Sequence, residues 1–256
     1  MNKIEVVSNN LILNDAGDII STYVNNDILT IDCKSDIKLI FINNIYKDVV
    51  INVLDNVALN ILEIKKEDSL DSNYKYILNE NSKVIINKFY YSGEYSENVN
   101  IDLNGYNSDA TFNLSVASFG NQKYNINIYH NNKKTISNVF NHGITFGDSV
   151  IDFIINGTVK KGMNDSILNQ DNKIMIMGNG KSSIEPNLFI EDDVIEARHG
   201  ASIGKFSEEE LFYLETRGIS REIGYELLIK GFLLNHLIIE DDVLEELEGI
   251  VCSLRR

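Results

Sequence analysis

The sequence is short of several residue types, and each shortage narrows the class of protein. Its 256 residues contain one proline, two cysteines and no tryptophan. Cys33 and Cys252 lie far apart and lack a metal-ligand spacing, unlike the cysteines of secreted disulfide scaffolds. No run approaches 18 apolar residues, and residues 1–10 have no signal-peptide core. We therefore expect a cytoplasmic protein with reduced thiols and no membrane span.

Positive charge is also scarce. The chain has 23 Lys and Arg against 38 Asp and Glu, which gives a formal net charge of −15. Nucleic-acid binding needs clustered basic side chains to neutralise phosphates, and the lysines of this chain are scattered. We therefore expect no nucleic-acid partner, and the acidity is typical of a solubilising surface.

The chain is rich in short strand-like runs from residue 4 to about residue 204. These runs of Ile, Val, Tyr and Phe, each about 5–7 residues long, are bounded by Asn, Asp, Gly and Ser. The clearest runs are residues 28–32, 37–42, 49–53, 58–64, 83–90, 99–103, 111–117, 124–129, 150–155 and 173–177. Their spacing suits a sandwich, a barrel or a solenoid. Frequent Asn favours a parallel β-helix, because Asn tolerates left-handed corners and stacks in ladders.

The pattern becomes helical after residue 205. Ser207 and Glu210 have the spacing of a capping box for a helix over residues 207–217. Ser220 can cap a second helix, and the acidic residues 240–242 can begin a third. The sequence therefore predicts a β region over 1–204 and a helical segment over 205–256.

Candidate chemistry centres on one histidine. His130, His142 and His236 are interpreted as structural, and His142 with the following glycine looks like a turn. His199 sits in a small-residue turn where the strand region ends, so we expect an exposed ring with a functional role.

An acidic run precedes this histidine. Glu191, Asp192, Asp193 and Glu196 cluster there, but adjacent strand residues face opposite sides, which favours a solvated turn. A two-carboxylate glycosidase site or a calcium site stays open as the alternative.

Several motifs in the last third of the chain resemble the C-terminal part of the SufB/SufD family, the scaffold components of the SUF iron–sulfur cluster assembly system. They are PNL at 186–188, DDV at 192–194, HGASIG at 199–204, ELFYL at 210–214, RGI at 217–219 and GF at 231–232. Residues 143–159 also resemble the family core, whereas residues 1–95 match loosely. The resemblance implies a right-handed parallel β-helix core followed by C-terminal helices.

The resemblance is closest to a short form of the SufD type. SufB-type chains read His-Glu-Ala where this chain has His199-Gly200-Ala201, and they carry a cysteine near the segment matching residues 169–173, where this chain has none. A chain without that thiolate should bind no cluster stably by itself. His199 matches a SufD histidine implicated in cluster formation at the interface with SufB.

The function implied by the resemblance is that of a non-enzymatic scaffold. It would pair with a SufB-like chain, share a transient iron–sulfur cluster with it, and recruit a SufC-like ABC-type ATPase through the helical segment. The expected ATPase-docking residues are Leu211, Phe212, Tyr213, Arg217, Ile223, Leu227, Leu228 and Phe232.

Two other functions remain open. The chain could be a minimal homodimeric scaffold that pairs with itself and uses Glu196 and His199 as cluster ligands. It could instead be a β-helix carbohydrate-active enzyme using the acidic run, although the absence of tryptophan argues against an aromatic-lined groove.

Overall fold

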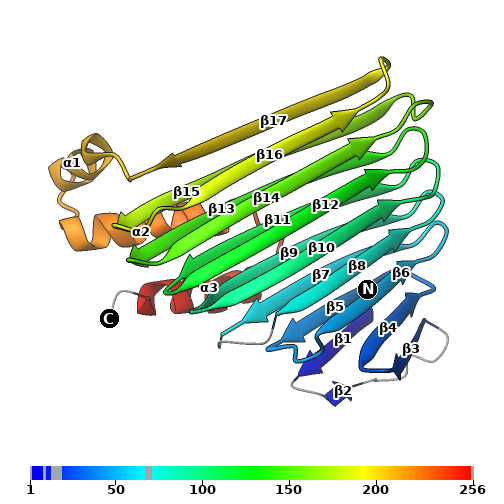
Figure 1. Ribbon diagram of the computed structural model, residues 1–256. Helices are drawn as coiled ribbons and strands as arrows, with labels where there is room; N and C mark the ends of the chain where they lie inside the picture. Colours follow the sequence, from blue (N-terminus) through cyan, green and yellow to red (C-terminus); the bar gives the residue numbers. More distant parts are fainter. Residues whose placement is uncertain (1, 8–9, 13–18, 67–70, 255–256) are drawn as a thin grey trace.

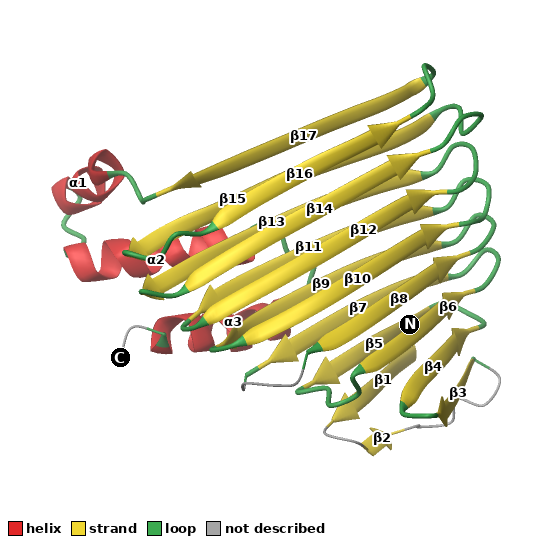
Figure 2. Cartoon of the chain, viewed as in Figure 1, coloured by secondary structure: helices red, strands yellow, loops and turns green. Residues whose placement is uncertain are grey.

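A computed structural model describes residues 2–7, 10–12, 19–66 and 71–254, which form 17 strands followed by three helices (Figure 1, Figure 2). The strands build two facing sheets, one of nine and one of eight strands in this described part. From β4 (Ile28–Cys33) to β17 (Ile195–Gly204) the chain crosses to the other sheet after every strand, and the neighbours within each sheet are parallel. The predicted parallel β-helix with a C-terminal helical segment is thus confirmed, with about six turns.

Each sheet collects alternate strands of the chain. Sheet A contains β1 (Asn2–Val7), β2 (Asn10–Ile12), β5 (Ile37–Ile42), β7 (Ala58–Lys65), β9 (Lys83–Ser92), β11 (Asp109–Ser118), β13 (Ile136–Gly147), β15 (Ser166–Gly178) and β17. Sheet B contains β3 (Ile20–Asn25), β4, β6 (Asp48–Val53), β8 (Ser72–Leu78), β10 (Tyr95–Leu103), β12 (Asn121–His130), β14 (Val150–Val159) and β16 (Ser183–Ile190). One strand from each sheet makes one rung.

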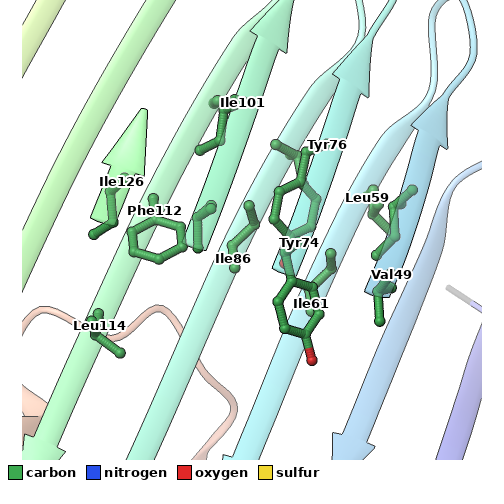
Figure 3. Close-up of a cluster of buried hydrophobic side chains, with 14 of the residues drawn as sticks. Val49, Leu59, Ile61, Tyr74, Tyr76, Ile86, Ile101, Phe112, Leu114 and Ile126 are labelled. Carbon is green, nitrogen blue, oxygen red and sulfur yellow. The ribbon is translucent and has the colours of Figure 1, made fainter. Parts of the chain in front are cut away.

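The alternation of buried and exposed side chains along each strand explains why these segments stack into a β-helix. In β10, Val99 and Ile101 are buried between the sheets, while Asn98 faces solvent. The same parity places Tyr76 and Ile86 in the core that fills the interior (Figure 3). Burial of one such side chain contributes roughly 1.5–3 kcal/mol, so repetition over the rungs stabilises the coil.

The corners between sheets B and A are left-handed. Asn56, Asn81 and Asn107 occupy this corner in successive rungs with φ values of 61°, 54° and 58°. Asn tolerates this conformation better than most residues, and the stacked amides also bond each other, with Asn107 Nδ2 2.9 Å from Asn81 Oδ1. Lys134 and Asp165 continue the same corner.

Asparagine ladders also cross the solvent face of sheet B, in addition to the corners where the sequence favours them. Asn127 bonds Asn100, Asn156 bonds Asn127 at 2.8 Å, and Asn187 bonds Asn156 at 3.0 Å. The ladder ends on β16.

The helices begin close to the predicted caps. They are α1 (Glu208–Thr216), α2 (Arg221–Leu234) and α3 (Asp241–Ser253). Ser207 accepts from the backbone N–H of Glu209, one residue earlier than the capping box predicts, and Ser220 accepts from Ile223. No helix among the described residues is long and apolar enough to cross a membrane.

Helices α2 and α3 cover the outer face of sheet A. Leu233, Leu247 and Val251 join a second hydrophobic cluster with strand residues such as Ile64 and Phe89. The middle strands of sheet A are therefore buried on both faces, whereas sheet B keeps its outer face in solvent.

Charged side chains inside the first rungs were not anticipated from the sequence. The Lys88 ammonium lies 3.0 Å from Glu63 and 2.8 Å from Glu97, and all three side chains are fully buried. Tyr74 donates to Glu63 at 2.6 Å, and Lys65 donates to Tyr95 at 2.5 Å. These contacts stabilise a buried ion group in the space between the sheets.

Two predicted turns are strands instead. His142 and Gly143 lie within β13, where a Cβ on Gly143 would come 2.8 Å from the Ile151 side chain, so this glycine makes room for packing. The small residues around His199 belong to β17, because they pair along the edge of β15.

Candidate functional site

The last rung is the open end of the β-helix. Within the described residues, β17 has only β15 as a neighbouring strand and β16 has only β14, so each has a free edge. Phe189, Val194 and Ile203 near these edges are 56%, 54% and 44% exposed. At the other end, antiparallel strands β2 and β3 lie against the sheets. The open rung is therefore an unfilled surface that another chain could extend.

His199 faces the inside of the open rung. It pairs with Gln170 on β15, whose side chain is buried between the sheets, so parity directs the His199 side chain to the same inner side. The His199 side chain is exposed, as predicted, because no further rung covers it. The inner positions of this rung are Ile184, Pro186, Leu188, Ile190, Ile195, Ala197, His199, Ala201 and Ile203.

Gln170 is a candidate residue that sequence reasoning missed. Its side chain is 5% exposed, and neither its amide nitrogen nor its carbonyl oxygen has a hydrogen-bond partner among the described residues. Gln170 lies one rung before His199, a spacing that the repeat length could have revealed. A buried, unpaired amide beside His199 makes the inner side of the open rung polar as well as apolar.

Glu196 does not converge with His199. It pairs with Ile167, which lies on the outer side of β15, so Glu196 points away from the interior. Its carboxylate bonds Arg198 at 2.6 Å, and both side chains are well exposed. Three residues apart on a strand, Glu196 and His199 face opposite sides and cannot ligate one ion from the same chain.

The cysteines are far from the open rung. Cys33 lies in β4, near the other end of sheet B, where burial raises the pKa of its thiol to about 12. Cys252 is exposed on α3, where its hydrogen bond to Glu226 raises the pKa of its thiol. The described residues contain no group of three or more His, Cys, Asp or Glu able to hold a metal.

The acidic run is a turn, as the sequence favours. The Asp192 carboxylate accepts from the backbone N–H of Val194 at 2.9 Å and of Gly162 at 2.6 Å. These hydrogen bonds lower the pKa of Asp192. This carboxylate therefore stabilises the connection between β16 and β17, which is a structural use of the group.

The helical segment exposes part of its predicted docking set. Phe212, Tyr213, Ile223 and Leu227 are 66%, 57%, 52% and 44% exposed, and Arg217 lies 5.2 Å from the Tyr213 ring. We call these five residues the docking face. A cavity of about 390 Å³ adjoins it, lined by Glu209, Glu210, Tyr213, Leu214 and Leu228.

Two members of the predicted docking set pack against neighbouring elements. Leu211 is fully buried and packs toward Gly224 of α2. Phe232 stacks on the His142 ring with 4.6 Å between ring centroids. Leu228 is half-buried at the cavity. Helix periodicity alone does not predict which apolar side chains pack against the neighbouring helix and sheet and which stay exposed.

Comparison with known proteins identifies the fold's relatives. The family described as "SUF system FeS cluster assembly, SufBD core domain" matches residues 31–232. An iron–sulfur cluster assembly SufBD family protein of Mycobacterium leprae is 41% identical over 63 residues, covering 24% of this chain and 16% of that protein. SufD of Bacillus subtilis is 28% identical over 123 residues, covering 46% and 28%. SufB of the same organism is 43% identical over 60 residues, covering 23% and 13%.

The aligned segments span less than a third of each of these relatives. The family match is broader, since it begins in β4 and continues into α2, and so takes in the open rung and the docking face. From the parallel β-helix, its C-terminal helices and this match, the chain belongs to the SufBD core family of the SUF iron–sulfur cluster assembly system.

Proposed function

We propose that this chain is a non-enzymatic, SufD-like scaffold subunit for iron–sulfur cluster assembly. It pairs with a SufB-like chain through the open rung and recruits a SufC-like ABC-type ATPase through the docking face. The nascent cluster is held transiently between the two scaffold chains and is not a resident group of this chain. Family membership supports the assembly role, and the surfaces of this chain support the finer assignments.

The open rung is the main support for the proposed pairing with a SufB-like chain. Two free strand edges lie side by side around inner positions that are mostly apolar, with His199 among them. A partner strand would satisfy the unpaired backbone groups and bury Ile203 and Phe189. The same contact would enclose His199, whose neutral imidazole can ligate iron while the partner supplies a thiolate.

The docking face supports the ATPase contact. Its exposed aromatic and aliphatic side chains are surrounded by carboxylates, among them Glu209, Glu210 and Glu215. Aromatic anchors beside a cavity are typical of protein interfaces, and the acidic rim fits a partner surface with basic residues.

The two surfaces are connected through the chain. Residues 205–207 join β17 directly to α1. The far end of α2 is attached to sheet A, because Ser115 donates to the Leu233 carbonyl and Asn87 bonds both backbone groups of Ile238. When an ATPase moves α1, the displacement therefore reaches β17 before it reaches the body, which would open the rung and expose His199 to cluster chemistry.

Co-purification with a SufC-like ATPase tests the docking assignment. Tyr213→Ala should weaken binding at micromolar concentrations at least tenfold, because this ring borders the cavity. Tyr106→Ala is a matched control, since Tyr106 is also an exposed tyrosine beside a cation, Lys134, but lies on a distant corner of the β-helix. Failure of the folded wild-type chain to bind the ATPase would contradict the proposal.

A minimal homodimeric scaffold is the second candidate, because the open rung could also receive a second copy of this chain. Anaerobic iron–sulfur reconstitution of the lone protein separates the two. We expect no stable visible chromophore without a SufB-like chain. A chromophore that forms in the lone protein and disappears in His199→Ala would favour the homodimer instead.

A further inference from the structure

Gln170 lies one rung beneath the open rung with its carboxamide unpaired. The side chain is 5% exposed, and both its amide nitrogen and its carbonyl oxygen are buried without a hydrogen-bond partner among the described residues. A buried carboxamide without partners costs free energy, because its hydration is lost and nothing replaces it. A group of this kind in a packed interior calls for an explanation other than packing.

Gln122 shows how the same side chain is satisfied elsewhere in the interior. It is 2% exposed on the inner side of β12, and its amide nitrogen donates to the carbonyl oxygens of Ser92 at 2.7 Å and Gly93 at 2.8 Å. Its own side-chain carbonyl accepts from the Tyr124 hydroxyl at 2.7 Å. Both ends of this carboxamide are therefore paired within the chain, whereas neither end of Gln170 is.

The neighbours of Gln170 leave one polar side chain beside it. In the register of sheet A, Gln170 lies between Val139 of β13 and His199 of β17, and of these two only His199 is polar. Across the interior, its amide nitrogen is 3.1 Å from the point where Gly157 would carry a Cβ, so β14 provides no side chain at that point. His199 is therefore the neighbour that could pair with the carboxamide.

In-register side chains on the inner side of these strands bond each other. Asn141 Nδ2 on β13 is 2.6 Å from Asn172 Oδ1 on β15, two residues along from Gln170. Asn172 in turn donates to the backbone carbonyl of Gly200 at 3.3 Å, which holds the backbone next to His199. The equivalent step from β15 to β17 brings the His199 ring within reach of the Gln170 carboxamide once the ring turns toward it.

We propose that Gln170 is a positioning residue for His199. Its carboxamide oxygen accepts the imidazole N–H of His199 when a partner strand covers the open rung, and the other ring nitrogen keeps its lone pair for iron. A metal-bound histidine usually donates its second N–H to such an acceptor, which fixes the tautomer and the orientation of the ring. This inference rests on the proposed function, because only a covering partner confines the ring that is now exposed.

Covering the rung is what makes this hydrogen bond favourable. In the free chain the His199 ring is exposed, so solvent competes for its N–H and little is gained by turning the ring toward the carboxamide. A partner strand excludes that solvent, and the imidazole N–H and the Gln170 oxygen then satisfy each other. The unpaired carboxamide of the free chain thereby becomes part of a site that is complete only in the complex.

The first test measures the free chain by urea denaturation. Gln170→Met keeps the length of the side chain and removes both unpaired polar atoms, so the equilibrium constant of unfolding should stay unchanged or fall by up to about tenfold. Gln122→Met is the matched control, because it removes hydrogen bonds that the folded chain makes, and should raise that constant by about tenfold or more. An equal rise for Gln170→Met would show a structural role and overturn the proposal.

The second test uses the complex with a SufB-like chain. Before iron is added, the imidazole ¹⁵N resonances of His199 should report one fixed tautomer with a slowly exchanging N–H. After anaerobic iron–sulfide reconstitution, Gln170→Met should lower the affinity for iron, read from the visible chromophore, by about tenfold, and should mix the tautomers. Gln170→Glu keeps an acceptor oxygen and should restore both readouts.

The outcomes separate this inference from the proposed function. If the two wild-type chains do not associate, or form no chromophore together, the proposed function fails and the role of Gln170 fails with it. If the wild-type complex holds the chromophore and Gln170→Met holds it equally well with an unchanged His199 tautomer, only the role of Gln170 is refuted.

Discussion

Corner residues show how single side chains set the path of the β-helix. The left-handed corner is held by Asn or Asp in most rungs, but Lys134 occupies it with a φ of 55°. A left-handed conformation costs most residues about 1–2 kcal/mol, and Asn and Asp are the partial exceptions. Lys134 is therefore the least favourable residue type at this position.

Replacing this lysine tests the corner account. Lys134→Asn should raise the free energy of unfolding by about 1 kcal/mol, because Asn relieves the backbone strain and can join the neighbouring amides. Urea denaturation measures the change. Asn107→Lys, at the equivalent corner one rung earlier, should lower stability by a similar amount. Equal stability of Lys134→Asn and wild type would show that the corner carries no strain.

The buried ion group is the second feature at this scale. Lys88→Met would leave the fully buried Glu63 and Glu97 with one neighbouring cation, Lys65, and should cost about 3–5 kcal/mol. Lys75→Met is the matched control, because Lys75 pairs with Asp102 at 3.1 Å on the solvent side and should cost below about 1 kcal/mol. Similar losses in both variants would refute the assigned role.

The ion group also predicts a pH dependence. Burial alone would raise the pKa of Glu63, but Lys88 and Lys65 outweigh it and hold that pKa below its ordinary value of 4.5. The contribution of Glu63 to stability is therefore complete above pH 4.5 and is lost as the pH falls through the lower folded pKa. Lys88→Met should show a shallower loss of stability on acidification than wild type, as followed by denaturation at several pH values.

Strand β17 is the element on which the proposed pairing depends. Ile203→Lys would place a charge at an inner position of the open rung and should abolish binding of a SufB-like chain while leaving the protomer's stability within about 0.5 kcal/mol. Val24→Lys is the control at the opposite end, where Val24 is 52% exposed on β3. Light scattering of mixtures reports the complex. If Val24→Lys lost binding of the SufB-like chain and Ile203→Lys kept it, the interface would lie at the opposite end of the β-helix, which would contradict the account.

Local signals explain which elements could be predicted. Ser207 and Ser220 cap their helices as expected, because a cap is a short-range interaction between neighbouring residues. Strand β12 was recognisable from its alternation of Asn and Ile. Short parts of β13 and β17 look like turns in the sequence, at residues 142–143 and 199–201, because their glycines resemble turn formers. In the structure Gly143 is required by the approach of Ile151 from sheet B.

Contacts between rungs explain what the sequence could not reveal. Glu97 meets Lys88 and Tyr90 inside the coil only because β9 and β10 meet across one corner, and Glu63 reaches them from the rung before. Contacts between rungs also determine the candidate site, because Gln170 and His199 are neighbours only through the register of β15 and β17. His199 stands out in the sequence by its small neighbours at the end of the strand region, and its exposure follows from the missing next rung.

At the scale of the whole molecule, the described residues form a β-helix with the open rung at one end and helices over one face. The number of residues per turn increases from about 20, where Ile28 pairs with Asp48, to about 31, where Asp152 pairs with Ser183. The turns near the open rung are thus longer than those at the other end, and α2 with α3 covers sheet A. This shape separates the open rung from the docking face, with residues 205–207 as the short connection between them.

The most direct measurement is the mass and composition of the complex formed by this chain, a SufB-like chain and a SufC-like ATPase, determined by analytical ultracentrifugation. The account predicts one assembly in which the two scaffold chains each carry an ATPase, and in which Ile203→Lys removes the SufB-like chain while Tyr213→Ala removes this chain's ATPase. A chain that stays monomeric in the presence of both proteins would contradict it.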